Sequence, residues 1–364
     1  MSTIYVLGAT GFTGQLICRE LQKAGLSFWA VGRAEARLEA LQQVFGKRFA
    51  ATLTTRTMSD FAHLAPELRD GDILINAVGP YLQLGPTFLQ PLLRRRVQYL
   101  DLTGEQAFVQ WMMREHKIGC WPSGVVQACA FESFFADLMA ERLLREQGAC
   151  LRVETAYLTL PPRPSPGTKA TMRQSQEAAT WRLKRGELES ATERTGRLIQ
   201  VEGWPEVEAL WPVPFPEVLF LARRARAQWA ESYFMGTRAH VDTMRAVHDS
   251  RSSVKVADGA LPPPARGIFS DPFDDRWAEV RYAILAAVYE SPTSIRGHGL
   301  VLSGRDPYFA TAVVAAECAQ ALLKRTEPIS GYFTPAEAFS DEIFERIVRA
   351  AGAELRVQRV ESSL

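Results

Sequence analysis

The chain of 364 residues is 47% hydrophobic and 23% charged, a globular composition that excludes a disordered or fibrous protein. Its 42 Lys and Arg against 41 Asp and Glu give a formal net charge of +1, so there is no general basic field to hold a nucleic acid. We expect two domains from the length, because one domain commonly takes about 100–200 residues. No apolar run reaches the roughly 18 residues of a membrane-spanning helix. The five cysteines form no CxxC pair, and we expect a reduced, cytoplasmic protein.

Residues 1–135 alternate short apolar runs with amphipathic stretches. The strands expected from these runs are 3–7, 28–31, 48–53, 72–78 and 97–102, and the helices between them are 12–24, 34–45 and 87–95. The run 72–78 is apolar without alternation, which is typical of a parallel strand buried on both faces. Repeated β-α-β units predict an α/β fold with a doubly wound parallel sheet of the Rossmann type, which binds ligands at the carboxyl ends of its strands.

The pattern changes after a helix predicted at 132–146. A strand at 153–160 leads into the proline-rich stretch 161–167, and a long polar helix is expected from 168 to about 188. The stretch 204–216 is dense in Trp, Pro and Phe, and it fits neither a helix nor a strand.

The last part of the chain mixes both kinds of element. We expect strands at 277–289 and 298–303 and helices at 307–324 and 335–351. The predicted organisation is a nucleotide-binding domain at 1–135, a second α+β domain for substrate or dimerisation at 136–300, and C-terminal helices at 301–364 that pack back on the first domain.

The motif GATGFTG lies between the first strand and the first helix. Gly8 allows the tight turn, Gly11 lets a pyrophosphate approach the backbone, and Gly14 lets the helix lie against the sheet. The spacing is GxxGxxG and departs from the GxGxxG of the usual NAD fingerprint. A chance glycine-rich turn is the alternative, but the position between strand and helix favours a dinucleotide site.

The end of the second strand predicts which dinucleotide binds. A chain that binds NAD places Asp or Glu there to hold the ribose 2′-hydroxyl group. Here the strand ends in Val31, Gly32 and Arg33, and a guanidinium group can bind a 2′-phosphate with two hydrogen bonds. Arg37, one turn later, fits a solvated helix position. The sequence therefore predicts NADP, bound as NADPH.

Five segments together resemble a known family. VLGATGFTG, AVGR, NAVGPYLQLG, YLDLTGE and ACAFESFFAD have the order and spacing of the saccharopine dehydrogenase-like NADP-binding oxidoreductases, nearest their trans-acting enoyl reductase branch. The resemblance is dense over 4–146, continues at Gly167 and Thr168, and returns at 303–308 and 331–339. It implies a Rossmann domain and a second α/β domain that closes over the nicotinamide.

The resemblance also implies three groups of site residues. The residues expected to contact the adenosine and pyrophosphate of the cofactor are Gly8, Thr10, Gly11, Phe12, Thr13, Gly14 and Arg33. The residues expected to contact the nicotinamide and its ribose are Asn76, Val78, Gly79, Pro80 and Tyr81. The residues expected to face the reacting carbon are Asp101, Thr103, Gly104 and Glu105. The candidate catalytic residues are Glu105, Tyr81 and Glu132, with Thr103 also expected to contact the cofactor.

Structural alternatives stay open for several of these residues. Asn76 and Thr103 can satisfy buried backbone groups, and the carboxylates of Asp101 and Glu105 can cap a helix. The segment 129–137 also departs from the family, because it has Ala130, Glu132, Phe134 and Phe135 where the family has Gly, Asp, Ile and Pro. Glu132 keeps the carboxylate on a longer arm, and the two phenylalanines predict a more aromatic pocket.

Other chemistries find little support in the sequence. There is no Tyr followed four residues later by Lys, no HExxH and no GxSxG, which argues against short-chain dehydrogenase, metal and serine hydrolase chemistry. Cys129 as a nucleophile has a buried small apolar role as its alternative. Tyr233 and His240 are candidate proton donors, and the arginines at 94–96 can dock an acidic carrier or simply be solvated.

The function expected from these observations is reduction of an activated C=C, such as the enoyl thioester of a hydrophobic or polyketide chain. The alternatives are reduction of a C=N of the saccharopine type and a non-catalytic NADP-binding scaffold. The expected partners are a hydrophobic or carrier-bound substrate and a second copy of the chain. Five aromatic side chains predict an apolar pocket beside the nicotinamide, with the hydrophobic core as the alternative: Phe134, Phe135, Trp204, Trp211 and Phe215.

Overall fold

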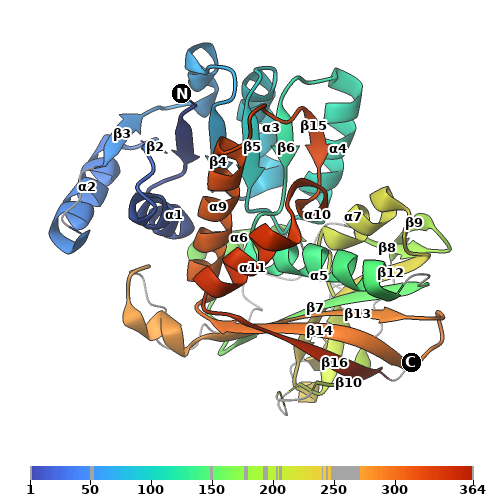
Figure 1. Ribbon diagram of the computed structural model, residues 1–364. Helices are drawn as coiled ribbons and strands as arrows, with labels where there is room; N and C mark the ends of the chain where they lie inside the picture. Colours follow the sequence, from blue (N-terminus) through green and yellow to red (C-terminus); the bar gives the residue numbers. More distant parts are fainter. Residues whose placement is uncertain are drawn as a thin grey trace.

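The structure is a computed structural model with two sheets and helices between them (Figure 1). It describes residues 2–49, 53–147, 151–175, 179–191, 196–201, 204, 207–239, 241–242, 245–246 and 271–362. Within this described part, none of the helices has the length and apolar character needed to cross a bilayer.

The first sheet has seven strands, and every neighbouring pair in it is parallel. Its order is β15 (Gly331–Phe333), β6 (Gly124–Val126), β5 (Gln98–Asp101), β4 (Ile73–Asn76), β1 (Ile4–Leu7), β2 (Phe28–Gly32) and β3 (Thr54–Thr57). The order 3-2-1-4-5-6 is that of a Rossmann sheet. The predicted fold class is confirmed.

Helices cover both faces of this sheet. Side chains alternate along β1, so Ile4 and Val6 pack toward α1 (Phe12–Lys23) and α2 (Glu35–Phe49) on one face. Tyr5 and Leu7 pack on the other face toward α3 (Tyr81–Leu93), α4 (Gln106–Gly119) and the 3₁₀ helix η1 (Phe61–Glu67). The carboxyl ends of β1, β4 and β5 therefore share one edge, below which the second sheet lies (Figure 1).

The second sheet has nine strands and is mostly antiparallel. Its order is β11 (Ala209–Pro212), β10 (Arg197–Gln200), β16 (Glu354–Ser362), β14 (Arg296–Arg305), β13 (Arg281–Tyr289), β7 (Arg152–Leu160), β12 (Trp229–Gly236), β8 (Thr180–Lys184) and β9 (Glu187–Ala191). β11 also pairs with β12, so seven strands form a closed ring. Only β7 and β12 run parallel. Apolar side chains such as Leu158, Leu285 and Met235 fill the ring.

Two long helices lie between the sheets (Figure 1). α5 (Phe131–Gln147) packs on β7, β13 and β14, and α9 (Pro307–Leu323) packs on α1, β4 and β5. The short helix α10 (Pro335–Ala338) and α11 (Asp341–Ala350) lie against them, while α6 (Pro166–Ser175) and α7 (Glu217–Arg224) belong to the second sheet's side.

Several predicted elements are wrong. The helix expected at 168–188 ends at Ser175, and the hairpin β8–β9 follows, because Arg185 and Gly186 both adopt positive φ and form its turn. The stretch 204–216 contains the strand β11. The third strand lies at 54–57 rather than at 48–53, since α2 continues to Phe49.

The C-terminal part is not only helical, as we had expected for 301–364. After α9 the chain adds β15 to the first sheet, and its last strand, β16, joins the second sheet. The return to the first sheet is held by Gln98, whose Nε2 donates to Ile329 O at 2.9 Å and whose Oε1 accepts from Ile329 N at 3.0 Å.

The Gln98 side chain gives a first prediction. Gln98→Leu should lower the free energy of unfolding by about 1–3 kcal/mol, because two backbone groups of Ile329 lose their buried partners. Urea unfolding measures this, with Gln43→Leu on the exposed face of α2 as the control, expected to change stability by less than about 0.5 kcal/mol. Equal losses in both variants would contradict the assigned role of Gln98.

Candidate functional site

The glycine motif forms a tight turn at the end of β1. The N–H groups of Gly8 and Ala9 both donate to Val31 O at 3.1 Å, and Gly8 has a φ of +79°, which favours glycine. A Cβ at Gly14 would lie 2.2 Å from Gly8 O. The turn therefore brings α1 against the strand end in a way that only glycine permits at these two positions.

The same turn fits a dinucleotide. Gly11 is exposed, and a Cβ there would meet only Gly8 O at 3.1 Å, so the space in front of it is open. Gly11 is the N-cap of α1 without a side-chain cap, and no acidic residue stands in the first turn. The N–H groups of this first turn, which includes Thr13, and the positive end of the helix dipole can therefore bind an anion.

Phe12 points elsewhere. Its ring makes edge contacts with Trp277 and Tyr308, with ring centroids 5.1 and 4.8 Å apart. Its side chain therefore ties α1 to the second half of the chain. The Thr10 side chain packs near Gly32 at the end of β2.

Arg33 lies directly after β2 and is exposed. It forms no hydrogen bond or ion pair with another residue in the described part of the chain. No acidic residue stands at this strand end. The guanidinium group is thus available for a 2′-phosphate, as the sequence predicts.

The turn after β4 is built by Asn76. Its Nδ2 donates to the Tyr99 hydroxyl group at 3.0 Å, and its Oδ1 accepts from Val78 N at 3.0 Å. The Gly79–Pro80 peptide bond is cis. Asn76 is fully buried, so this turn offers a cofactor the backbone at 78–80 rather than the Asn76 side chain.

Tyr81 and Glu105 are both engaged within this turn. The Tyr81 hydroxyl group donates to Asn76 O at 3.4 Å, and burial raises the pKa of Tyr81 well above its usual range. Glu105 accepts from Tyr81 N at 2.8 Å and Leu82 N at 2.9 Å, and so caps α3. Glu105 also accepts from Thr171 Oγ1 at 3.1 Å, which connects α6 to the first sheet. This geometry favours positioning roles for both residues.

Two more residues at the end of β5 form hydrogen bonds with neighbouring parts of the chain. Thr103 Oγ1 accepts from Glu105 N at 3.0 Å. Asp101 is buried and accepts from Ala128 N at 2.8 Å and Gln127 Nε2 at 3.0 Å, which joins β5 to the loop after β6. Burial raises the pKa of Asp101 to about 6, against the opposing effect of these hydrogen bonds.

Glu132 has a different environment. It begins the first turn of α5, and its Oε1 would lie 3.7 Å from a Cβ at Gly104, so it borders the loop after β5. Its Oε2 is buried and has no hydrogen-bond partner in the part of the chain that the structure describes. Desolvation, with a smaller effect of the nearby Glu217, raises the pKa of Glu132 to about 7.

Glu217, at the start of α7, was not predicted from the sequence. It is fully buried, and its Oε2 accepts from Ser232 Oγ at 3.1 Å. Desolvation raises its pKa to about 7, although the hydroxyl groups of Ser133 and Tyr157 face it and lower the pKa. Nothing in the local sequence marks this residue, because its neighbours come from α5, β7 and β12.

A second set of contacts that the sequence did not reveal involves Tyr308. Its hydroxyl group accepts from Ser165 N and lies 3.1 Å from Thr168 Oγ1. Both motif segments of the family resemblance, at Gly167 and Thr168 and at 303–308, therefore meet at the start of α6. They fix the helix that reaches Glu105 through Thr171.

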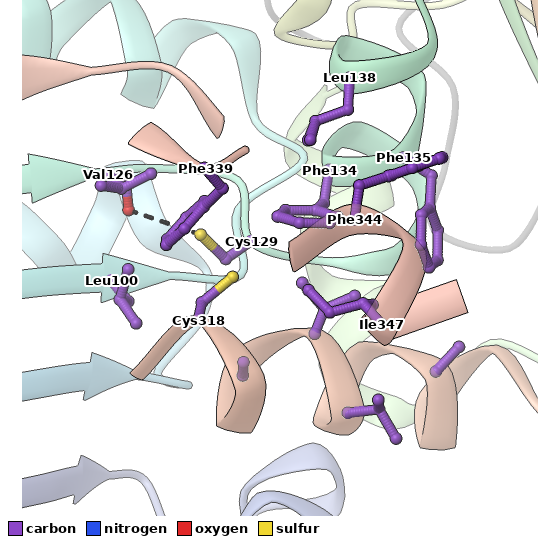
Figure 2. Packing of buried hydrophobic residues seen from close by; sticks show 14 of the residues in the cluster. Leu100, Val126, Cys129, Phe134, Phe135, Leu138, Cys318, Phe339, Phe344 and Ile347 are labelled. Atoms are coloured by element: carbon purple, nitrogen blue, oxygen red, sulfur yellow. Dashed lines mark hydrogen bonds between the residues drawn. The ribbon is translucent and has the colours of Figure 1, made fainter. Parts of the chain in front are cut away.

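The predicted aromatic pocket is wrong for four of its five residues. Phe134 and Phe135 are fully buried in the core, where they pack against Phe339 and Phe344 (Figure 2). Trp204 lies in the core of the ring, and Trp211 in a separate small core cluster. Only Phe215 borders the strand ends: it lies 4.5 Å from Tyr157, centroid to centroid, and next to Gly104. Core packing explains the others.

The remaining candidates lie away from this edge or outside the described residues. Cys129 is buried, and Figure 2 shows its sulfur facing Cys318 within the same core. Tyr233 donates to Glu231 at 2.7 Å within the ring, and His240 lies outside the described residues. Arg94, Arg95 and Arg96 are exposed. Within the described residues, no group of three or more His, Cys, Asp or Glu side chains is placed to hold a metal ion.

Comparisons with known proteins give matches to the first part of the chain and to its whole length. Residues 4–121 match the family model of the saccharopine dehydrogenase NADP binding domain. A lipid droplet localized protein of Caenorhabditis elegans is 32% identical over 37% of this chain and 34% of its own length, so the match spans about a third of that relative. A Mycobacterium tuberculosis protein whose name proposes a trans-acting enoyl reductase is 26% identical over 99% of this chain and 98% of its own.

One solved structure has the same overall fold. Saccharopine dehydrogenase (L-Glu forming) from Saccharomyces cerevisiae, in its apo form, aligns with a TM-score of 0.60 and 14% identity, over 99% of this chain and 100% of that one. The parallel sheet with its glycine turn lies largely within residues 4–121, which match an NADP binding domain of oxidoreductases. More particularly, residues 4–121 match the saccharopine dehydrogenase NADP binding domain, and the chain as a whole is similar to proteins of that kind. The family predicted from the sequence is confirmed.

The two raised carboxyl pKa values give a prediction on stability. Both values rise from 4.5 to about 7 on folding, so a stabilising effect present below pH 4.5 is lost as the pH rises through 7. The free energy of unfolding of Glu217→Gln, relative to that of wild type, should therefore be higher at pH 8 than at pH 5, by about 1–3 kcal/mol.

Denaturant unfolding at the two pH values measures this difference. Glu189→Gln is the matched control, because Glu189 is exposed and paired with Arg182, which lowers its pKa. The control should show no gain at pH 8. A Glu217→Gln difference that is the same at both pH values would contradict the raised pKa.

Proposed function

We propose that this chain is an NADPH-dependent reductase of an activated C=C, such as the enoyl thioester of a hydrophobic or polyketide chain. The likeness to the Mycobacterium tuberculosis protein along the full length of both chains is the observation that carries this proposal. A carrier-bound acyl chain is the partner that such a reaction implies, and the cytoplasm is the compartment we propose.

Different residues of the chain would bind different parts of the cofactor. The N–H groups after Gly11 face the pyrophosphate, Arg33 binds the 2′-phosphate, and the backbone at 78–80 contacts the nicotinamide side. NADPH, when bound, supplies a hydride. Glu105 keeps α3 and α6 in place around this turn through its three hydrogen bonds.

The charges beside the strand ends favour a neutral acceptor. Glu132 and Glu217 are both acids from which burial removes water, and desolvation raises the pKa of each to about 7. A dicarboxylic imine of the saccharopine type would place more negative charge near these acids, and like charges at close range disfavour each other. An acyl thioester carries no such charge, and the Phe215–Tyr157 ring pair offers it apolar contact.

Arg33→Ala tests the cofactor assignment. We expect the affinity for NADPH to fall more than tenfold, because a charge-assisted contact contributes about 1.5–3 kcal/mol, while the affinity for NADH stays nearly unchanged. Fluorescence titration of the reduced nicotinamide measures both affinities. Arg37→Ala, at an exposed helix position, is the control and should leave both unchanged. Equal losses for the two cofactors in Arg33→Ala would refute the 2′-phosphate contact.

Substrate class is tested by NADPH oxidation. Hydrophobic enoyl thioesters and dicarboxylic imines are compared at matched concentrations, and we expect faster turnover of the enoyl thioesters, since they bury apolar surface without adding charge. Turnover confined to the imines would establish the saccharopine-type alternative. NADPH binding without oxidation by either class would establish a scaffold.

A further inference from the structure

We propose that Glu132 and Glu217, called here the acid pair, form the proton supply of the reductase, with Glu132 as the donor to the acceptor and Glu217 as its positioning residue. The inference rests on the proposed reduction and names the group that completes it. The sequence pointed to Glu132 only through the family resemblance and gave no sign of Glu217.

Position is the first argument. Glu132 lies where the loop after β5 meets the first turn of α5, next to Gly104 and Phe215. This is the edge at which a doubly wound sheet presents its ligand. The polar side-chain atoms of Tyr81 and Glu105, the other two candidates, already form hydrogen bonds within the turn after β4.

Unsatisfied hydrogen-bonding capacity is the second argument. Buried polar atoms almost always have a partner, and an exception calls for a cause. Within the described residues, Glu132 Oε2 and Glu217 Oε1 are both buried without a hydrogen bond of good geometry. A carboxyl group that only capped α5 would direct its oxygens at backbone N–H groups, as Glu105 does at α3.

The surroundings keep a proton on the pair. Besides the two carboxyl groups, the titratable side chains that face Glu132 are Tyr81 on α3, Tyr157 on β7 and Tyr308 on α9. All are neutral, because burial raises the pKa of each tyrosine. The two acids repel each other as anions, and each has a pKa of about 7, so at neutral pH the pair holds about one proton.

The hydroxyl groups around Glu217 connect it to the second sheet. Ser232 Oγ donates to Glu217 and lies 2.9 Å from Thr155 Oγ1. Tyr157 faces both acids from β7. These contacts hold Glu217 at the inner end of the pair, which leaves Glu132 at the outer end beside Gly104.

The proposed step balances with the reductant already named. The C=C π bond of the enoyl thioester breaks, its β-carbon gains a hydride from NADPH, and its α-carbon gains a proton from the carboxyl group of Glu132. NADP⁺ and a saturated acyl thioester result. The Glu132 carboxylate then regains a proton from solvent, and Glu217 stays in place as its positioning residue.

The pH profile of turnover tests the pair. Glu132→Gln should lower kcat about a hundredfold or more, with the Kd for NADPH unchanged, since general acids contribute at least this much. Glu217→Gln should keep most of the activity at pH 6 and shift the alkaline limb of kcat to lower pH, because the repulsion by Glu217, which adds to desolvation in raising the pKa of Glu132, is gone. Glu231→Gln, within the ring, is the control and should keep the wild-type profile.

A measurement without substrate separates this inference from the proposed function. The infrared C=O band of a protonated carboxyl group should be present at pH 6 in wild type, fade toward pH 8, and weaken in Glu132→Gln and in Glu217→Gln. If neither variant alters the band, or if Glu217→Gln leaves the pH profile unchanged, the acid pair is rejected even where enoyl thioesters are reduced. A band that titrates as expected in a protein that reduces no enoyl thioester rejects the proposed function and keeps the pair as a proton-holding site.

Discussion

The two sheets are joined by packing through α5 and α9. The apolar helix α9 packs on β4 and β5 of the first sheet, and α5, which contacts α9, buries one apolar face on β7, β13 and β14 of the second sheet. One continuous core runs from Ile4 and Val6 in β1, across both helices, to Ile284 in β13. The position of the first turn of α5 relative to β5 is fixed by this close-packed core together with the hydrogen bonds that Gln127 and Ala128, just before the helix, donate to Asp101.

That constraint decides the chemistry at the strand ends. The first turn of α5 brings Glu132 to the loop after β5, and the same packed layer covers Glu217 on α7. Both acids lose water without gaining a cation, which is why their pKa values rise while Asp137, buried but paired with Arg224, has its charge compensated. The proton-holding pair that we propose would therefore be a consequence of how the fold covers its central helices.

The sequence predicted the nucleotide-binding half well, because its signals are local. Glycine spacing, apolar runs and the residue after β2 each lie within a few positions, and the structure shows the expected turn at Gly8 and an exposed Arg33. It failed where neighbours are distant. The hairpin β8–β9 depends on pairing with β12. The rings of Phe134 and Phe135 pack against Phe339 and Phe344, which lie about two hundred residues later in the chain. Glu217 could not be found, since its environment comes from three other elements.

The same division explains how such a protein can change its substrate without losing its fold. In the proposed site the cofactor would be held by three turns of the first sheet, whereas the acceptor side would be assembled from residues of separate elements: Gly104, Glu132, Tyr157, Phe215 and Glu217. On this proposal, a change at one of these residues would alter charge or shape beside the nicotinamide without replacing the apolar residues of the α5–α9 core. The yeast saccharopine dehydrogenase shares the fold at 14% identity, so the fold places few demands on individual residues. Fold alone therefore does not define the substrate, and our proposal for this chain rests on the residues of its proposed acceptor side, which are acidic and aromatic.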